Sequence, residues 1–409
     1  MKELRYFFSG AYTIGLSSVF SLLTPIIVIP YLIKTVGISN YGLSIVVFSI
    51  SMILSIVIDF GFNITGVNRI TKDRSKNNVI KTVISITFCK TFLFTVVLAA
   101  SGLAFFLIQG IRSYFVLFMY SLAIPFSSIF NFNWALQGLE KLKLLALITV
   151  LGKAIYLGLV FCLIIEPKDY IYINGCFGIG IIIAGFFAGR LILKEYPIND
   201  KVTLQKSLII EEFRSSYHYF ISNISIYFSS FLFPVIVGMF TNIEMAGIYS
   251  IVEKVYNFSR AIFSIYQTIM FPRISNLIEG SVSSAKKAVK NTYAFVVLFV
   301  IFEAIIIFVF NQQIVQYFTT EHIDLTKKLL NMSAFALLFV AVNCPFYLLA
   351  IASDMKEKIM NTFFVLSLIA VFCCCILVYL FGLFGALWAL IFTEALYSVL
   401  MIIIWRTRK

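Results

Sequence analysis

The sequence predicts an all-α, polytopic membrane protein with about twelve transmembrane helices, and two observations lead to this fold class. Hydrophobic residues make up 61% of the 409 positions and charged residues only 12%, whereas soluble domains carry about 25% charged residues. Apolar stretches of about 20 residues, long enough to cross roughly 30 Å of hydrocarbon, recur along the whole chain. Polar linkers of the kind that join soluble domains are not visible between them.

Each expected span is an apolar stretch bounded by polar or charged residues. The spans are expected at 6–33, 43–68, 82–108, 114–136, 144–166, 171–193, 216–240, 245–272, 291–311, 329–352, 359–381 and 384–404. The first stretch follows Lys2 and Arg5, but it is too long for a signal peptide and lacks a small-residue cleavage site. We therefore expect it to be retained as a span.

The distribution of positive charge predicts the orientation in the membrane. When Arg190 at the end of span six is counted with the loop that follows it, 23 of the 32 Lys and Arg residues lie on the side of the N-terminus and 5 lie on the opposite side. Because Lys and Arg are retained on the cytoplasmic side, both termini are predicted to be cytoplasmic. The net charge of +13 is therefore interpreted as a topology signal and as contact with anionic lipid head groups, rather than as nucleic-acid binding.

A weak internal repeat divides the chain into two halves. Pro30, Gly42, Arg69 and Gly178 recur at an offset of about 204 residues as Pro234, Gly247, Arg273 and Gly382. We expect spans one to six, residues 1–200, to form an N-terminal lobe and spans seven to twelve, residues 201–409, to form a C-terminal lobe. Because each half has an even number of spans, the repeat is parallel, an arrangement found in transporters. Chance matching of Gly and Pro in an apolar chain is the alternative.

Ionisable residues at span depth are costly to bury and therefore mark candidate functional surfaces. They are Asp59 in span two, Lys90 in span three, Lys153 in span five, Glu253, Lys254 and Arg260 in span eight, Glu303 in span nine and Glu394 in span twelve. Steps of three or four residues in span eight place on one helical face Tyr249, Glu253, Asn257, Arg260, Ser264 and Gln267. A polar stripe of this length predicts a water-filled cavity beside it.

The positive charges at this depth predict an anionic ligand. Lys90, Lys153 and Arg260 are expected well inside their spans. An Arg guanidinium binds phosphate through paired charge-assisted hydrogen bonds, and a Lys ammonium acts on phosphate as a point charge. The alternative is that the acidic residues only neutralise basic neighbours inside a dry helix bundle, although buried ion pairs seldom repay their desolvation.

Motifs for ATP hydrolysis, catalysis and metal binding are not found in the sequence. It contains no Gly-x-x-x-x-Gly-Lys-Ser/Thr phosphate loop, no Gly-x-Ser-x-Gly elbow and no His-Glu-x-x-His pair. All seven cysteines fall at span depth without metal-ligand spacing, and there are only two histidines. We therefore expect neither an enzyme nor a cofactor or metal site, and coupling to protons or cations stays open.

The segment at the cytoplasmic end of span four reads Asn133-Trp134-Ala135-Leu136-Gln137-Gly138-Leu139-Glu140-Lys141-Leu142-Lys143. It resembles the Trp-x-x-Gln-Gly-x-Glu-x-x-Lys segment of the Wzx-type O-antigen flippases, the polysaccharide-repeat transporters of the MOP superfamily. Further stretches similar to this family are Pro30-Tyr31-Leu32, Asn40-Tyr41-Gly42, Asp59-Phe60-Gly61-Phe62-Asn63, Ala246-Gly247-Ile248-Tyr249-Ser250 and Pro272-Arg273-Ile274-Ser275. The likeness extends over the full length and is specific only in these segments.

The resemblance implies a MATE-like fold and a flippase that moves undecaprenyl-pyrophosphate-linked oligosaccharide from the cytoplasmic to the outer leaflet by alternating access. It implies a multi-pass protein of the bacterial cytoplasmic (inner) membrane. The implied partners are the lipid-linked oligosaccharide, membrane lipids, a polysaccharide polymerase and a chain-length regulator. The cavity would then comprise Lys90, Lys153, Arg260, Lys254, Asp59, Glu253, Asn257, Tyr249 and Glu303, with Lys90, Lys153 and Arg260 on the phosphates. Relatives with fourteen spans use an extra helix pair as a tail groove, which this chain lacks.

Other interpretations stay open at this point. A MATE-type exporter of small cationic compounds would use acidic binding groups and would need no deep basic residues. A membrane polysaccharide polymerase would be expected to carry catalytic residues on large outer loops, and the expected outer loops are short. The segment from Gln137 to Lys143 has the alternative role of a structured turn that fixes helix packing, and for Asp59 ion pairing competes with a proton- or cation-linked role.

Overall fold

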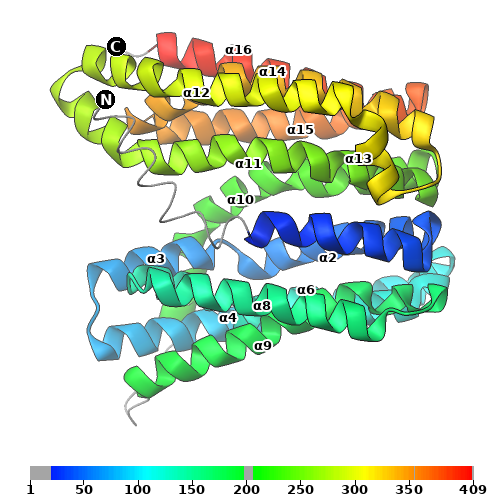
Figure 1. Cartoon of the computed structure of the whole chain (residues 1–409). Helices are drawn as coiled ribbons and strands as arrows, with labels where there is room; N and C mark the ends of the chain where they lie inside the picture. Colours follow the sequence, from blue (N-terminus) through cyan, green and yellow to red (C-terminus); the bar gives the residue numbers. More distant parts are fainter. Residues whose placement is uncertain (1–19, 198–205, 354, 408–409) are drawn as a thin grey trace. The chain divides into compact units, whose positions relative to one another are not determined.

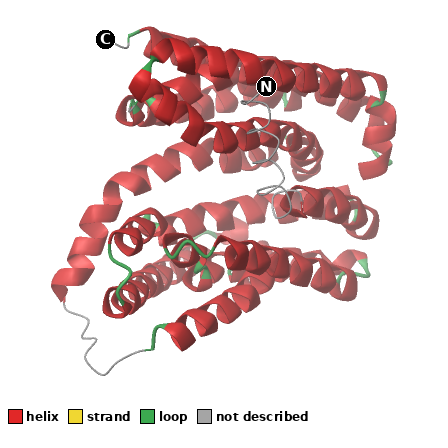
Figure 2. Ribbon diagram, turned by 60° about the vertical axis from the view of Figure 1, so that its left-hand side comes forward, coloured by secondary structure: helices red, strands yellow, loops and turns green. Residues whose placement is uncertain are grey.

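The computed structural model describes residues 20–197, 206–353 and 355–407, and all regular elements in these ranges are helical (Figures 1 and 2). A helix at Phe20–Val36 comes first. It is followed by α2 (Ile38–Asp59), α3 (Phe62–Lys72), α4 (Lys76–Leu107), η1 (Gln109–Tyr114), α5 (Phe115–Ser121), α6 (Ala123–Phe130), α7 (Asn133–Gly138), α8 (Leu142–Leu163), η2 (Pro167–Tyr172), α9 (Ile173–Glu195), α10 (Lys206–Phe240), α11 (Ile243–Gly280), α12 (Val282–Val309), α13 (Asn311–Phe318), α14 (Ile323–Ala352), α15 (Lys356–Phe381) and α16 (Leu383–Arg406). Residues 6–19 of the first expected span lie outside the described residues.

Nine helical segments in the described ranges are long and apolar enough to cross a bilayer. They are Ile38–Lys72, Lys76–Leu107, Gln109–Gly138, Leu142–Leu163, Pro167–Glu195, Val282–Val309, Ile323–Ala352, Lys358–Phe381 and Leu383–Arg406. The helices Phe20–Val36 and Ser229–Phe240 are apolar but shorter, and α11 has 38 residues but is more polar. The all-α polytopic class is confirmed, and these last three helices coincide with expected spans one, seven and eight. The cytoplasmic location of the termini stays a prediction.

The described chain divides into two compact units, each with its own apolar core. Thr35–Phe231 form the N-terminal unit, and the described residues of Met1–Lys34 together with Leu232–Lys409 form the C-terminal unit. These boundaries differ from the expected division between residues 200 and 201. One reason is that the first half of α10 packs on α3, where Arg69 forms an ion pair with Glu212. The six-plus-six repeat itself stays a prediction.

The second expected span, 43–68, lies within the segment Ile38–Lys72, which a turn between α2 and α3 interrupts. Phe60 and Gly61 adopt left-handed φ angles of 43° and 79°. A Cβ atom on Gly61 would also lie 2.7 Å from the carbonyl oxygen of Ser216 and 2.8 Å from Cβ of Tyr219, both on α10. Glycine is therefore required here for the turn and for the close approach of α10.

The fourth expected span, 114–136, is also broken, into the end of η1 and the helices α5, α6 and α7. Pro125 lacks the N–H group that would bond to the carbonyl of Ser121, where α5 ends. At the end of α6, the Asn131 side chain accepts a hydrogen bond from the backbone N–H of Asn133 at 3.2 Å, which turns the chain before α7. Two broken spans thus lie within the N-terminal unit, the second after Asp59 and the fourth after Ser121 and again after Phe130.

The segment that resembles the flippase family packs α7 against α3. Trp134 is buried, and a Cβ atom on Gly66 would come closer to its ring than van der Waals contact permits. A Cβ atom on Gly138 would lie 2.9 Å from Cβ of Ile70. The segment therefore fixes helix packing through small residues that face large ones.

Two ion pairs fix the turn that follows α7. Arg74 lies 2.5 Å from the Glu140 carboxylate, and its hydrogen bond and charge hold the pKa of Glu140 below the ordinary value. Lys141 pairs with Glu195 at the end of α9. The structure thus gives this part of the segment the turn geometry that was the alternative to direct substrate contact.

We expect the change Gly66→Ala to lower the thermal stability of the purified protein, because overpacking a tight helix contact costs about 1–3 kcal/mol. Gly102→Ala in α4 is the matched control, since nothing lies within 4 Å of a Cβ atom there and both changes bring the same gain in helix propensity. Unfolding followed by tryptophan fluorescence in detergent measures both. Equal melting temperatures in the two variants would contradict the packing role.

Candidate functional site

A buried polar cluster lies at the two helix breaks of the N-terminal unit. The ammonium group of Lys90, on α4, is 3.0 Å from the Asp59 carboxylate at the end of α2. It donates to Oδ1 of Asn63 in α3 at 2.8 Å and to the carbonyl oxygen of Ser128 in α6 at 3.3 Å. Lys90 is 1% exposed, so its three donors are matched by three protein acceptors.

The helix break explains why this lysine can be buried. A helix C-terminus carries partial negative charge, and α2 ends at Asp59, one residue before the left-handed turn. The positive ammonium group of Lys90 therefore lies close both to the Asp59 carboxylate and to the partly negative end of α2. A phosphate at Lys90 would have to displace Asp59, and the predicted phosphate contact of Lys90 stays a prediction.

Polar side chains from this cluster line a cavity of about 370 Å³. Its polar lining includes Ser55, Asp59, Asn63, Ser127, Ser128, Asn131 and Tyr227. A second cavity of about 150 Å³ shares with it the walls formed by Asn131, Phe177 and Ile181. The two cavities therefore adjoin along α9 and the end of α6.

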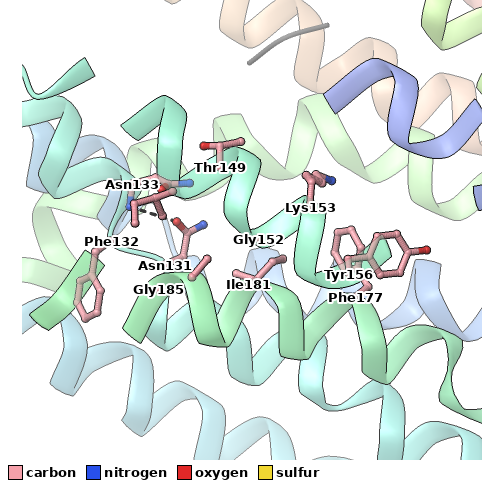
Figure 3. A pocket seen from close by; sticks show the side chains of 12 residues that line it. Asn131, Phe132, Asn133, Thr149, Gly152, Lys153, Tyr156, Phe177, Ile181 and Gly185 are labelled. Carbon is pink, nitrogen blue, oxygen red and sulfur yellow. Dashed lines mark hydrogen bonds between the residues drawn. The ribbon is translucent and has the colours of Figure 1, made fainter. Parts of the chain in front are cut away.

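Lys153 lines the second cavity, together with Asn131, Asn133 and Thr149. Figure 3 shows the lysine beside the aromatic rings at one end and the two asparagines at the other. The ammonium group lies 4.9 Å from the centre of the Phe177 ring, within cation–π range. A cation, two amides and a hydroxyl thus border one small cavity at span depth.

Arg260 is the central cation of the C-terminal unit. Its guanidinium lies 3.1 Å from Oε1 of Glu394, and Tyr256 donates a hydrogen bond to the same oxygen at 2.9 Å. The Arg260 side chain is 46% exposed, whereas that of Glu394 is 3% exposed. Glu394 and Tyr256 therefore hold the guanidinium from the core side, and part of its five-donor fork faces outward.

The polar stripe of α11 forms a network one turn before Arg260. Lys254 lies 3.4 Å from the Glu253 carboxylate, which also accepts a hydrogen bond from the Asn257 amide at 3.4 Å. Asn257, Arg260 and Ser264 are exposed. Polar side chains that are exposed at span depth require water or ligand beside them.

Tyr249 and Glu303 are buried inside the C-terminal unit. The Tyr249 ring packs against Phe233, with centroids 6.5 Å apart. Glu303, on α12, has Ser259 as a hydrogen-bonding neighbour, and its Oε2 has no hydrogen-bond partner among the described residues. Their predicted places in a cavity stay predictions.

The structure brings the predicted residues together in separate groups. Asp59 and Lys90 form one, and Glu253, Lys254 and Asn257 form another. Sequence reasoning named Glu394 as an ionisable residue at span depth but not as the partner of Arg260. It missed the other residues that border Lys153 or hold Arg260, which are Asn131, Asn133, Thr149, Phe177 and Tyr256. Two asparagines two residues apart in an apolar span were the available signal for the cavity of Lys153.

Comparisons with known proteins agree with this architecture. A family profile described as "Polysaccharide biosynthesis protein" matches residues 7–278. A Shigella dysenteriae protein named "Putative O-antigen transporter" is 22% identical over 389 residues, which are 93% of this chain and 95% of that protein. An Escherichia coli (strain K12) protein of the same name is 23% identical over 257 residues, 63% of this chain and 62% of that protein.

Solved structures of transporters share the fold. An inward-facing multidrug resistance MATE family transporter of the MOP superfamily has a TM-score of 0.76 at 12% identity, with 98% of this chain and 97% of that chain covered. An outward-facing conformation from the same family has a TM-score of 0.62 at 14% identity, with 96% and 93% covered. The MATE-like fold is thus confirmed.

We expect Asp59→Asn to destabilise the N-terminal unit by about 3–5 kcal/mol, because it leaves the buried Lys90 without its counter-charge. The double change Asp59→Asn and Lys90→Gln is expected to recover part of the loss. Thermal unfolding of the unmodified protein, the two single variants and the double variant measures the coupling between the two residues. Additive effects of the two changes would contradict a coupled pair.

Proposed function

Because the chain belongs to the polysaccharide biosynthesis protein family, we propose that it is a flippase for an undecaprenyl-pyrophosphate-linked oligosaccharide. It moves this lipid from the cytoplasmic to the outer leaflet of the bacterial cytoplasmic membrane by alternating access of two six-helix lobes. The names of its relatives, both O-antigen transporters, and the MATE-like fold support transport rather than catalysis. In the proposed cycle, the enzymes that build the repeat act before the flippase, and the enzyme that polymerises the repeat acts after it.

The cavity of Lys153 is the observation that carries the proposal. A sugar pyrophosphate needs a cation for its phosphates, amide and hydroxyl groups for its hydroxyls, and an aromatic face for a sugar ring. Lys153, Asn131, Asn133, Thr149 and Phe177 supply these groups around one cavity (Figure 3). An ionisable residue at membrane depth that lines a cavity is a functional-site candidate by default.

The pairing of the acidic residues supports an anionic substrate over a cationic one. Asp59 is neutralised by Lys90, Glu253 by Lys254 and Glu394 by Arg260. An exporter of cationic compounds would need acidic groups that are available to its substrate. Among the site acids, Glu303 differs, because no ion pair to it is found within the described residues, and it is buried.

We expect Lys153→Ala to block export of the lipid-linked oligosaccharide, because a hydrogen bond to a charged group contributes about 1.5–3 kcal/mol. In cells that lack another flippase, surface polysaccharide should fall and single lipid-linked repeats should accumulate on the cytoplasmic leaflet. Lys290→Ala, at an exposed lysine of α12, is the control. Normal surface polysaccharide in the Lys153→Ala variant would sink the proposed head-group site.

Arg260→Lys is expected to retain part of the export that Arg260→Ala loses, since lysine keeps the charge toward Glu394 but not the planar fork. Export is measured in the same cells, with protein levels compared by immunoblot. Arg406→Ala, at an exposed arginine of α16, serves as the matched control. Equal export by Arg260→Ala and the unmodified protein would remove Arg260 from the site.

A further inference from the structure

An apolar groove runs along the C-terminal unit between the helix Phe20–Val36, α11 and α13. Its volume is about 470 Å³, within the range of small-molecule sites. Its walls include Leu22 and Pro25 from the first helix, Phe258 from α11 and Ile314 from α13. This groove is separate from the cavities of the N-terminal unit, whose linings are rich in amides and hydroxyls.

The groove also has a polar border on α11. Lys254 and Asn257 line it, and both are linked to Glu253. Arg260 follows Asn257 by three residues, which is about 4.5 Å along the helix axis. One helix therefore carries, in succession, an apolar groove wall and a half-exposed cation. Such an arrangement matches an amphiphile with an apolar chain and an anionic head.

A proline explains how α13 becomes a wall of this groove. Pro30 has no N–H group, so the carbonyl of Ile26, four residues earlier, has no partner within its own helix. The hydroxyl of Tyr317 on α13 donates to this carbonyl at 3.3 Å. The hydrogen bond holds α13 against the first helix beside the groove, so the groove is a built feature rather than a packing gap.

The first helix also exposes apolar side chains next to the groove. Leu23 and Ile27 are exposed, while Leu22, Pro25 and Ile26 line the groove. In a membrane-spanning unit, exposed apolar side chains such as these are suited to contact with lipid chains. A lipid chain can therefore reach the groove sideways from the bilayer, without crossing water.

We infer that this groove binds the isoprenoid chain of the lipid-linked substrate, with Lys254 and Asn257 at the polar border of the groove. The inference rests on the proposed function and gives the chain a tail site that does not need a thirteenth and fourteenth span. A phospholipid acyl chain is the competing occupant of an apolar groove that faces the bilayer. The two occupants differ in their selectivity among lipids.

The test uses a prenyl pyrophosphate that carries a photoreactive diazirine in its chain, with the purified full-length protein in lipid nanodiscs. After irradiation, mass spectrometry of peptides is expected to place the label on Phe20–Val36 and α13. An excess of unlabelled prenyl phosphate should remove the label, and an equal excess of phosphatidylglycerol should not. Label found only elsewhere, or equal competition by phosphatidylglycerol, would overturn the inference.

A variant that fills the groove gives an independent reading. Ile314→Trp is expected to reduce labelling about ten-fold, the effect of 1.4 kcal/mol in binding. Leu298→Trp, at a lipid-exposed position of α12, is the matched control and should label normally. Unchanged labelling of a folded Ile314→Trp variant would contradict the assignment of the groove. If that variant does not fold, the position of the label on the peptides of the unmodified protein tests the assignment instead.

Binding of the water-soluble sugar pyrophosphate head, without a chain, separates this inference from the proposed function. Ile314→Trp should leave head binding unchanged, whereas Lys153→Ala should weaken it. Loss of groove labelling with intact head binding would refute the tail site alone. Specific groove labelling combined with normal export by Lys153→Ala would refute the proposed head site alone.

Discussion

The buried ion pair between Asp59 and Lys90 is the interaction on which the N-terminal unit depends. A lysine that is 1% exposed at span depth is tolerable only with its counter-charge and acceptors in place. These acceptors come from the ends of α2 and α6 and from the start of α3, so the pair ties together both helix breaks. Because Asn131 lies at the second break, the same interaction sets the walls of the two polar cavities.

The helices could be predicted because the bilayer demands long apolar stretches, but their interruptions could not. The break at Gly61 depends on a close approach of α10, which lies about 155 residues later in the chain. The repeat shows the same limit. Gly42 and Gly247 are each the fifth residue of their helices, whereas Gly178 lies inside α9 and Gly382 lies between two helices with a φ of 58°. The sequence offset therefore aligns the helix starts better than the later turns.

The site was partly predictable because ionisable residues stand out in an apolar sequence. The pairing between them could not be predicted, since Arg260 meets Glu394 from a helix at the far end of the chain, and helical periodicity reports only neighbours on the same helix. The stripe of α11 was assigned to one face, yet Tyr249 at its start is buried. A row of side chains at steps of three or four residues winds slowly around its helix, so such a row can begin in the core and end beside a cavity.

The docking of α10 on α3 also has a consequence for how the protein is made. Glu212 is buried, accepts from Ser85 and pairs with Arg69, which precedes it by 143 residues. At about 5–20 residues per second, Arg69 waits roughly 7–30 s for this partner during synthesis. During that interval α3 keeps an uncovered charge and stays with water or lipid head groups. The helix that closes this gap continues past Leu232 into the C-terminal unit, so one helix both completes the N-terminal unit and leads back into the C-terminal unit.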